Sequence, residues 1–545
     1  MSKPIDMPPT TAIIASNFLV QTLMRVSLIA CIATTLLPQA VQAQSSDLTD
    51  PFLLRSAVPN RTVGPGDRPN VLFIIVDDLN VALGSYLDST SHPHYATAKT
   101  PHIDRLASEG VRFERAYSQY AACNPSRASL MSGLRPSTSG IYSNQNNANS
   151  AWRPKIGADF RLLPEHFHDF GYFTARVGKI SHNTNEDQIS WDVSRFALSR
   201  EPGVRFHVPG YLPGSDQSEE RDNTWAVATE DGMVRGEVAR KRPGGLALSW
   251  RATNESPRMT PDGTTATRII QLMAENRDKP FFIAAGFHKP HQPWVGPASF
   301  FEQHPTDSIQ LADTPPDDAK DIPIPAMGIY KDDQLHTDRQ KKQAIAAYHA
   351  MVTMIDSYVG ELLNALKLLE LDDSTIVVFA SDHGFHLNEH GGVWRKSTQF
   401  EESTRVPLIV RLPNGQSAGQ VTGGLVELVD LYPTLVDLAG LPQPAHELDG
   451  ASFKPLIEDP DRKWKSAAFS EHRGRGYHGR TLREKRYRYT EWTPIKDKEG
   501  ETLRELYDLE EDPFEYDNLA ARPGNESLVA ELSQRLEAGW QGAQP

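Results

Sequence analysis

The sequence predicts an α/β fold in which helices sandwich a large sheet, followed by a smaller C-terminal α+β subdomain. Several apolar runs lack alternation, which is typical of strands buried on both faces of a parallel sheet. A long helical pattern separates two of these runs, and this strand–helix–strand order indicates an α/β domain. After residue 460 the apolar runs become shorter and charged turns separate them. A chain of 545 residues is long enough for two such units.

The first 43 residues are predicted to be an export signal. Lys3 and Arg25 precede a twelve-residue apolar run at 26–37, which is too short to span a bilayer and ends near a small-residue cleavage motif. A disordered or anchoring leader is the alternative. We therefore expect an exported protein, periplasmic or secreted. A bacterial protein is favoured over a lysosomal one because the mature chain would lack a cysteine pair for a disulfide. We expect no stable membrane insertion, and a polar lead-in over residues 44–67.

Charge and cysteine content narrow the possible partners. The formal net charge is −14, and an acidic surface disfavours nucleic acid and anionic membranes. An anionic substrate would need positive charge concentrated locally.

Of the two cysteines, Cys31 lies in the predicted signal, so Cys123 alone would remain after cleavage. A single thiol cannot form an internal disulfide, and its value must lie in packing, metal binding or reactivity.

The predicted large sheet lies in a first domain over residues 68–460. A long helix is expected near residues 341–371, where apolar side chains recur at helical spacing. A short strand is expected at 172–177, and residues 183–263 are polar and irregular, as in an insertion that sets specificity. The unalternating apolar runs that define the main strands are 70–76, 280–287, 375–380 and 406–411.

The C-terminal subdomain is expected over residues 461–545. Short β-rich runs occur at 466–471, 486–492 and 505–508, and a helical pattern covers 527–541. This order predicts a small antiparallel sheet with one helix.

Ionisable residues follow the apolar runs directly. The first run ends in Asp77-Asp78, the second in His288-Lys289-Pro290-His291, and the third in Ser381-Asp382-His383-Gly384. Ligands of open α/β sheets bind beyond the carboxyl ends of strands. Adjacent carboxylates there are costly unless a cation neutralises them, and oxygen-rich clusters suit Ca²⁺ or Mg²⁺. Helix caps or solvated turns are the alternative for any one of these pairs.

His383 complicates the choice of metal. Calcium prefers oxygen ligands, so this histidine could instead orient Asp382 or the substrate. Zinc would accept it, but the excess of carboxylates and the lack of thiolates favour a harder ion.

Cys123 precedes a helix predicted over residues 127–132, with Pro125 suited to its first turn. A helix N-terminus favours anions, and Arg127 would lie about one turn away. A buried structural thiol is the alternative for Cys123.

Further basic groups could hold an anion. Lys179 and His182 are three apart after the short strand, and Lys396 follows a segment with three glycines. Any one of them alone could be a solvated surface group. Together they would supply the local positive charge that an acidic protein needs for an anionic ligand.

These motifs resemble the type I, formylglycine-dependent sulfatase family. Cys123-Asn124-Pro125-Ser126-Arg127 is similar to the signature in which cysteine is oxidised. The histidines around His288-Lys289-Pro290-His291 and Asp382-His383 are most similar to the iduronate 2-sulfatase branch, whereas many sulfatases carry Asn in place of His383. Further matches lie between about residues 68 and 520: Arg68-Pro69-Asn70, Thr100-Pro101-His102-Ile103-Asp104, Gly178-Lys179 with His182, and Glu505-Leu506-Tyr507-Asp508-Leu509.

The resemblance implies an alkaline-phosphatase-like fold and a formylglycine at position 123. A hydroxyl of its hydrated form would attack sulfur, and a maturation enzyme would be the partner that installs it. His291 or His182 would protonate the leaving alcohol. The residues implied to stabilise the sulfuryl oxygens are Arg127, Lys179 and Lys396. The residues implied to hold one calcium ion are Asp77, Asp78, Cys123 in its modified form, Asp382 and His383.

Three functions follow as hypotheses. The first is a sulfatase acting on a sulfated sugar or polysaccharide. The second is a phosphomonoester or phosphonate hydrolase of the same superfamily, often with two zinc ions. The third is an inactive glycan-binding protein, which would need degraded nucleophile or metal residues, and none is missing in this sequence.

Overall fold

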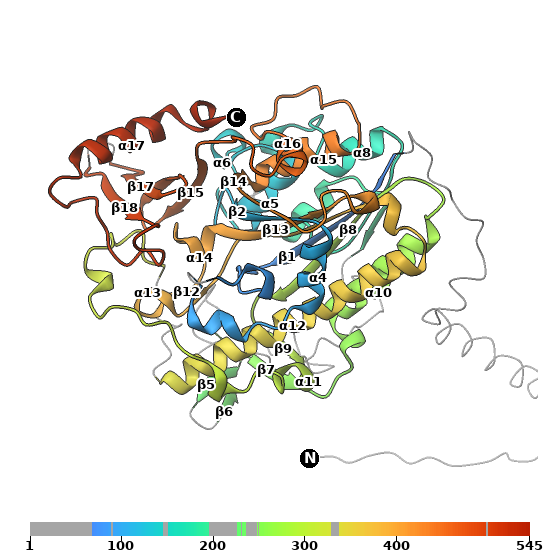
Figure 1. The fold of residues 1–545 in the computed structure, drawn as a ribbon, viewed down its shortest axis with the longest axis horizontal. Coiled ribbons are helices and arrows are strands. Elements are labelled where there is room, and N and C mark those ends of the chain that lie inside the picture. The colour runs from blue at the N-terminus through green and yellow to red at the C-terminus, as the bar shows by residue number, and fades with distance from the viewer. Residues whose placement is uncertain are drawn as a thin grey trace, which may run out of the picture. The chain divides into compact units, whose positions relative to one another are not determined.

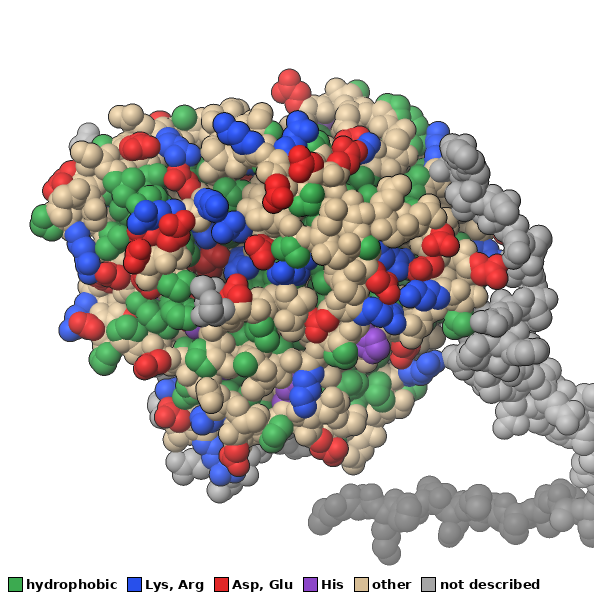
Figure 2. Space-filling view, viewed as in Figure 1, with side chains coloured by type: hydrophobic (Ala, Val, Ile, Leu, Met, Phe, Trp, Pro, Cys, Tyr) green, Lys and Arg blue, Asp and Glu red, His purple; other side chains and the backbone are tan. Residues whose placement is uncertain are grey.

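The computed structural model describes residues 68–88, 91–144, 151–195, 226–229, 232–235, 248, 250–328, 337–497 and 500–545. The predicted export signal, the lead-in and much of the predicted insertion lie outside these residues. Within the described part of the chain, no helix has the length and apolar character needed to cross a bilayer. Figure 2 shows acidic and basic side chains interspersed over the face that it draws.

Eight strands form the large sheet at the centre of Figure 1, in the order β14-β2-β13-β10-β1-β8-β3-β4. The central strand β1 is parallel to both β10 and β8, with Val76 opposite Ser381 on one side and Phe287 on the other. The strands are β1 (Asn70–Asp77), β2 (Val111–Tyr117), β3 (Phe173–Gly178), β4 (Val193–Arg195), β8 (Phe281–Pro290), β10 (Thr375–Ser381), β13 (Arg405–Arg411) and β14 (Gln420–Glu427).

All four long apolar runs are strands of this sheet, but one direction differs from expectation. β13 runs antiparallel to β10, with Val378 opposite Val410. The expectation of a parallel strand is wrong here because burial on both faces produces an apolar run whichever way the strand points. β8 is also longer than expected, since it continues to Pro290 and includes the polar residues at its end.

Helices cover both faces of the sheet. The long helix α12 (Asp338–Leu368) confirms the predicted helix and starts with a capping box between Thr337 and Gln340. It packs with α10 (Pro261–Glu275) on one face, where both contact β8, and α4 (Pro101–Glu109) joins them (Figure 1). The other face carries α5 (Cys123–Ser132), α8 (Leu163–Asp169) and α15 (Leu431–Leu438), which share one core with β1.

The smaller sheet near the C-terminus has four antiparallel strands. They are β15 (Ala468–Gly474), β16 (Tyr477–Arg483), β17 (Tyr487–Pro494) and β18 (Leu503–Asp508). α17 (Glu526–Ala538) packs on the sheet through Leu532 and Leu536, as expected of one antiparallel sheet with one helix. Strand β16 was not predicted from the sequence, because its polar side chains and Gly479 leave no apolar run. The boundary at residue 460 stays a prediction.

Candidate active site

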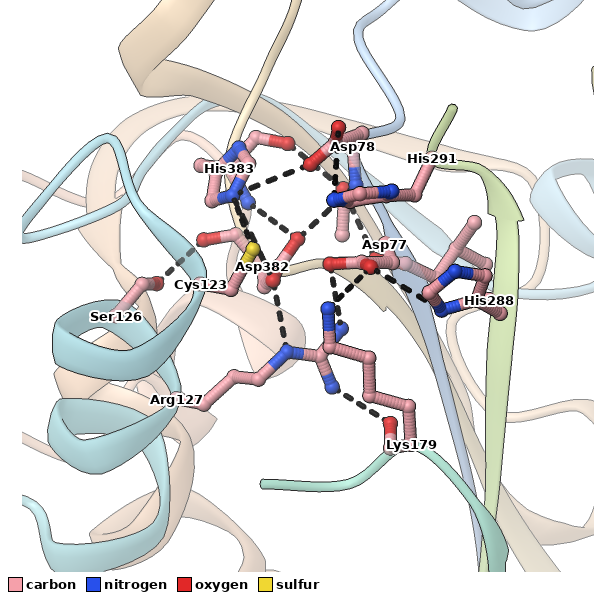
Figure 3. Close-up of polar contacts among 12 residues, drawn as sticks. Asp77, Asp78, Cys123, Ser126, Arg127, Lys179, His288, His291, Asp382 and His383 are labelled. Atoms are coloured by element: carbon pink, nitrogen blue, oxygen red, sulfur yellow. Dashed lines mark hydrogen bonds and ion pairs between the residues drawn. The ribbon is translucent and has the colours of Figure 1, made fainter. Parts of the chain in front are cut away.

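The two aspartates at the end of β1 meet the end of β10. Parallel pairing of the two strands brings Asp77 and Asp78 beside Asp382, and all three side chains are buried. The Asp78 N–H donates to Asp382 Oδ1 at 3.2 Å, and the His383 N–H donates to the same oxygen at 3.1 Å. The expected convergence of polar strand ends is therefore present in the structure (Figure 3).

Cys123 lies at the first residue of α5, not ahead of the helix. The predicted start at Arg127 is wrong because the Ser126 N–H already bonds the Ala122 carbonyl, with Pro125 in the first turn. The Cys123 Sγ atom lies 3.4 Å from His383 Nε2 and 3.4 Å from Lys396 Nζ. Burial, with the charge of Asp77, raises the pKa of the Cys123 thiol to about 12. An unmodified thiol here would stay protonated at neutral pH, which makes it a weak nucleophile.

Arg127 joins the aspartates from below in Figure 3. Its Nε donates to Asp382 Oδ2 at 2.7 Å, and its Nη2 donates to Asp77 Oδ1 at 3.3 Å. Its Nη1 donates to the carbonyls of Lys179 at 2.6 Å and Ile180 at 3.1 Å. The guanidinium is fully buried, so it acts as a fixed positive charge between two carboxylates.

Two lysines add positive charge, each beside a different aspartate. The Lys179 ammonium pairs with Asp77, and the Lys396 ammonium pairs with Asp78. Burial alone would lower the pKa of both lysines, but the aspartates raise it, so both remain charged. Gly178, at a φ of +84°, places Lys179 where β3 closely approaches β8. A Cβ at Gly178 would lie 2.0 Å from the Gly286 carbonyl oxygen.

Histidines line the same site. His291 Nε2 lies 3.9 Å from Asp78 Oδ2, and its Nδ1 donates to the Gln292 carbonyl at 2.6 Å. Burial holds the pKa of His291 well below its usual range. Burial, with the charge of Lys179, lowers the pKa of His182 to about 3. Both rings are therefore neutral at physiological pH in this structure, and the choice of general acid between them stays open.

Donor atoms for a metal ion are gathered in two overlapping sets. Within each set the donor atoms lie within 4.8 Å of one another. Burial alone would raise the pKa of Asp77, but the positive charges of Lys179 and Arg127 hold it well below its usual range. The residues that form the sets are Asp77, Asp78, Cys123 and His291 in one, and Asp77, Cys123, Asp382 and His383 in the other.

The donor set is compatible with a hard divalent ion. His383 Nδ1 donates to the Gly384 carbonyl at 2.9 Å, which leaves its Nε2 as the lone-pair atom facing Asp78 at 3.4 Å. Three buried carboxylates with one such histidine fit a metal ion.

One residue at this site, Asp262, was missed from the sequence, and another, His288, was named only as part of its motif. Asp262, in the first turn of α10, accepts from the His288 N–H at 2.7 Å and the Lys289 N–H at 3.1 Å. His288 Nδ1 lies 3.7 Å from Asp77 Oδ2. His288 stands in a motif that was recognised, but Asp262 reads locally as an ordinary helix-start residue after the Thr260 cap. Nothing local in the sequence connects Asp262 to β8.

The fold is the alkaline-phosphatase-like α/β fold, with its polar strand ends gathered around Cys123. The chain matches the family model described as Sulfatase over residues 69–441, and therefore belongs to the sulfatase family of sulfuric ester hydrolases. A model described as N-sulphoglucosamine sulphohydrolase, C-terminal, matches residues 388–541.

Relatives refine the place of the chain within the family. It is 34% identical over 422 residues to a Mus musculus protein named iduronate 2-sulfatase, covering 69% of this chain and 70% of the relative. It is 31% identical over 461 residues to a Formosa agariphila protein named sulfatase, covering 83% of each. The chain is thus iduronate 2-sulfatase-like. The phosphonate monoester hydrolase of Agrobacterium radiobacter shares the fold with a TM-score of 0.67 and 23% identity, over 86% of this chain and 95% of that structure.

Proposed function

We propose that this protein is an exported, calcium-dependent sulfatase that removes sulfate from a sulfated sugar or polysaccharide, using formylglycine made from Cys123. The observation that carries the proposal is the position of Cys123. Its Sγ lies within 4.8 Å of donor atoms from Asp77, Asp382 and His383, at the start of a helix. The name of the mouse relative supports a sulfated uronate as one substrate class.

The proposed ligands of the metal are Asp77, Asp78, Asp382 and His383, with an oxygen of modified Cys123. Calcium bound there would supply positive charge for the sulfuryl oxygens. Arg127 holds Asp77 and Asp382 in fixed positions from the buried side of the site. The ligand-bearing carboxylates are therefore oriented before substrate binds, which is the condition for electrostatic stabilisation without reorganisation.

The nucleophile is the hydrated aldehyde at position 123, made by a formylglycine-generating or sulfatase-maturating enzyme. One of its two hydroxyl groups gives its proton to a neighbouring carboxylate, and its oxygen bonds to sulfur while the bond from sulfur to the sugar oxygen breaks. The sugar oxygen takes a proton from His291 or His182 and leaves as an alcohol. The second hydroxyl then loses its proton, the carbon–oxygen bond to sulfate breaks, and the aldehyde re-forms. Neither serine nor an unmodified cysteine has the second hydroxyl that this last step needs.

The lysines hold the anionic ester. Lys179 directly follows β3, and Lys396 directly follows the short strand β12 (Trp394–Arg395). Their ammonium groups stay charged beside the aspartates. Each is a compact positive charge suited to a tetrahedral oxyanion. An anionic ester beside the two neutral histidines favours their protonation, because a nearby negative charge raises the pKa of an imidazole.

The test compares sulfate release from 4-nitrophenyl sulfate with phosphate release from 4-nitrophenyl phosphate. A sulfatase releases sulfate faster, and Cys123→Ala abolishes that activity while the circular dichroism spectrum is unchanged. Faster phosphate release would favour the phosphomonoester or phosphonate hydrolase alternative. Binding of sulfated glycan without turnover, in protein with verified formylglycine, would favour an inactive binding protein. Sequencing the N-terminus of protein from the periplasm or medium tests export, with a start after residue 43 expected.

A further inference from the structure

We infer that Tyr142 and Arg473 form a subsite for the anionic group of a sugar unit that neighbours the sulfated unit at Cys123. This inference rests on the proposed sulfatase function and specifies its substrate as a charged oligosaccharide or polysaccharide. It joins the loop after α6 (Pro136–Ser139) to the β15–β16 hairpin of the smaller sheet. We call Tyr142, Arg473, Glu471 and His478 the Tyr142 platform.

The segment that carries Tyr142 contacts the residue beside the nucleophile. The backbone N–H of Asn124, which follows Cys123, donates to Asn144 Oδ1 at 2.8 Å. The Asn124 side-chain amide donates to the Ser143 carbonyl, also at 2.8 Å. Tyr142 therefore belongs to the segment that contacts the residue beside the nucleophile. The chain before Cys123 is attached to the hairpin as well, since the Arg473 N–H donates to Tyr120 Oη at 2.8 Å.

Arg473 offers an exposed positive charge at this position. Its guanidinium carbon lies 3.5 Å from the centroid of the Tyr142 ring, and the residue is exposed. Among the residues that the structure describes, no acidic side chain forms an ion pair with Arg473. Arg480 on the same hairpin is different, because it pairs with Glu491 at 3.7 Å and Glu537 at 3.4 Å. A stacked guanidinium keeps its N–H edge for a ligand.

The aromatic base of the platform is held rigidly. The Tyr142 ring meets His478 edge-on at 5.7 Å and Tyr120 at 6.3 Å. His478 Nε2 bonds Glu471 Oε2 at 2.8 Å, and the Tyr142 hydroxyl bonds the same carboxylate. Glu471 therefore has its own partners inside the platform. A fixed ring beneath an arginine lowers the entropy lost when a ligand orders that side chain.

The chemistry of the platform selects a planar or tetrahedral anion. A guanidinium edge binds a carboxylate or a sulfate through two parallel hydrogen bonds. In a sulfated polysaccharide, a sugar adjacent to the reacting unit offers such a group as a uronate carboxylate or a second sulfate. A neutral aryl group offers neither. The platform therefore favours charged polymers over simple aryl esters.

The test uses a heparin-derived tetrasaccharide as the probe, with 4-nitrophenyl sulfate as the small substrate. Calorimetric titration measures tetrasaccharide binding to the whole protein and to Arg473→Ala, Arg473→Lys and Arg480→Ala. Loss of a bidentate contact predicts about tenfold weaker binding for Arg473→Ala. Arg473→Lys recovers only part of the affinity because it keeps the positive charge but cannot form two parallel hydrogen bonds. Arg480→Ala is the matched control and binds like the wild type.

Turnover separates this inference from the proposed function. In the wild type, the tetrasaccharide inhibits hydrolysis of the aryl sulfate. Arg473→Ala weakens this inhibition by a larger factor than it lowers kcat/KM for the aryl sulfate itself. Equal losses in both, unchanged tetrasaccharide binding, or no binding by the wild type would overturn the subsite. A wild-type protein that binds the tetrasaccharide through Arg473 but releases no sulfate would support the subsite and refute the proposed function.

Discussion

Replacing Arg127 with alanine removes the buried cation that joins two of the proposed metal ligands. The wild-type side chain is fully buried and contacts Asp382 at 2.7 Å and Asp77 at 3.3 Å. It also bonds two backbone carbonyls. Removing one partner of a buried ion pair leaves an uncompensated charge and costs about 3–5 kcal/mol. We expect a loss of that size in the free energy of unfolding, measured in urea with a chelator present.

A matched control is available on the surface. Arg161 pairs with Asp169 at 2.7 Å, but their side chains are 50% and 44% exposed. Arg161→Ala should therefore change stability by less than about 1 kcal/mol. Arg127→Lys keeps the positive charge but not the planar set of N–H donors, and we expect an intermediate loss in the free energy of unfolding.

Calcium adds a second readout to the Arg127→Ala experiment. Without the guanidinium, the aspartates carry more uncompensated negative charge, so added calcium should stabilise Arg127→Ala more than it stabilises the wild type. Ligand at about one hundred times its Kd contributes about 2.7 kcal/mol. An Arg127→Ala protein that unfolds at the wild-type urea concentration in chelator would refute the assigned role of this buried cation.

Three further predictions concern the metal, the backbone and pH. A chelator should abolish sulfate release, and calcium rather than zinc should restore it; full activity in chelator would contradict the metal proposal. Gly178→Ala should cost more than about 1 kcal/mol because Gly178 has a positive φ and a Cβ there would meet the Gly286 carbonyl. Burial alone would lower the pKa of His390, but the neighbouring carboxylates of Asp318, at 3.3 Å, and Glu402, at 3.8 Å, raise it to about 10. That stabilisation is complete below the ordinary pKa of 6.5 and is lost as pH rises through about 10, so His390→Gln should flatten urea stability over that window.

The sequence located the main strands well because burial on both faces leaves an unambiguous apolar signal. It also placed the polar groups at the ends of β1 and β10, since those apolar runs stop abruptly at Asp77 and Asp382. Strand direction was less accessible. β13 has the same composition whether parallel or antiparallel, so nothing within residues 405–411 encodes its orientation.

Contacts between elements that are distant in the sequence could not be predicted from it either. Asp262 supports the end of β8 through backbone N–H groups, and any sequence there would offer the same donors. The Tyr142 platform depends on a hairpin more than three hundred residues away, whose strand β16 lacks an apolar pattern. Local residue types predicted the chemistry of the site, whereas the supporting contacts became visible only in three dimensions.

Peptide mass spectrometry across residue 123, on the same preparation used for kinetics, tests the central claim most directly. The account predicts that sulfate release per molecule rises in proportion to the fraction of chains carrying the aldehyde at this position. Full turnover from protein whose Cys123 is entirely an unmodified thiol would contradict it.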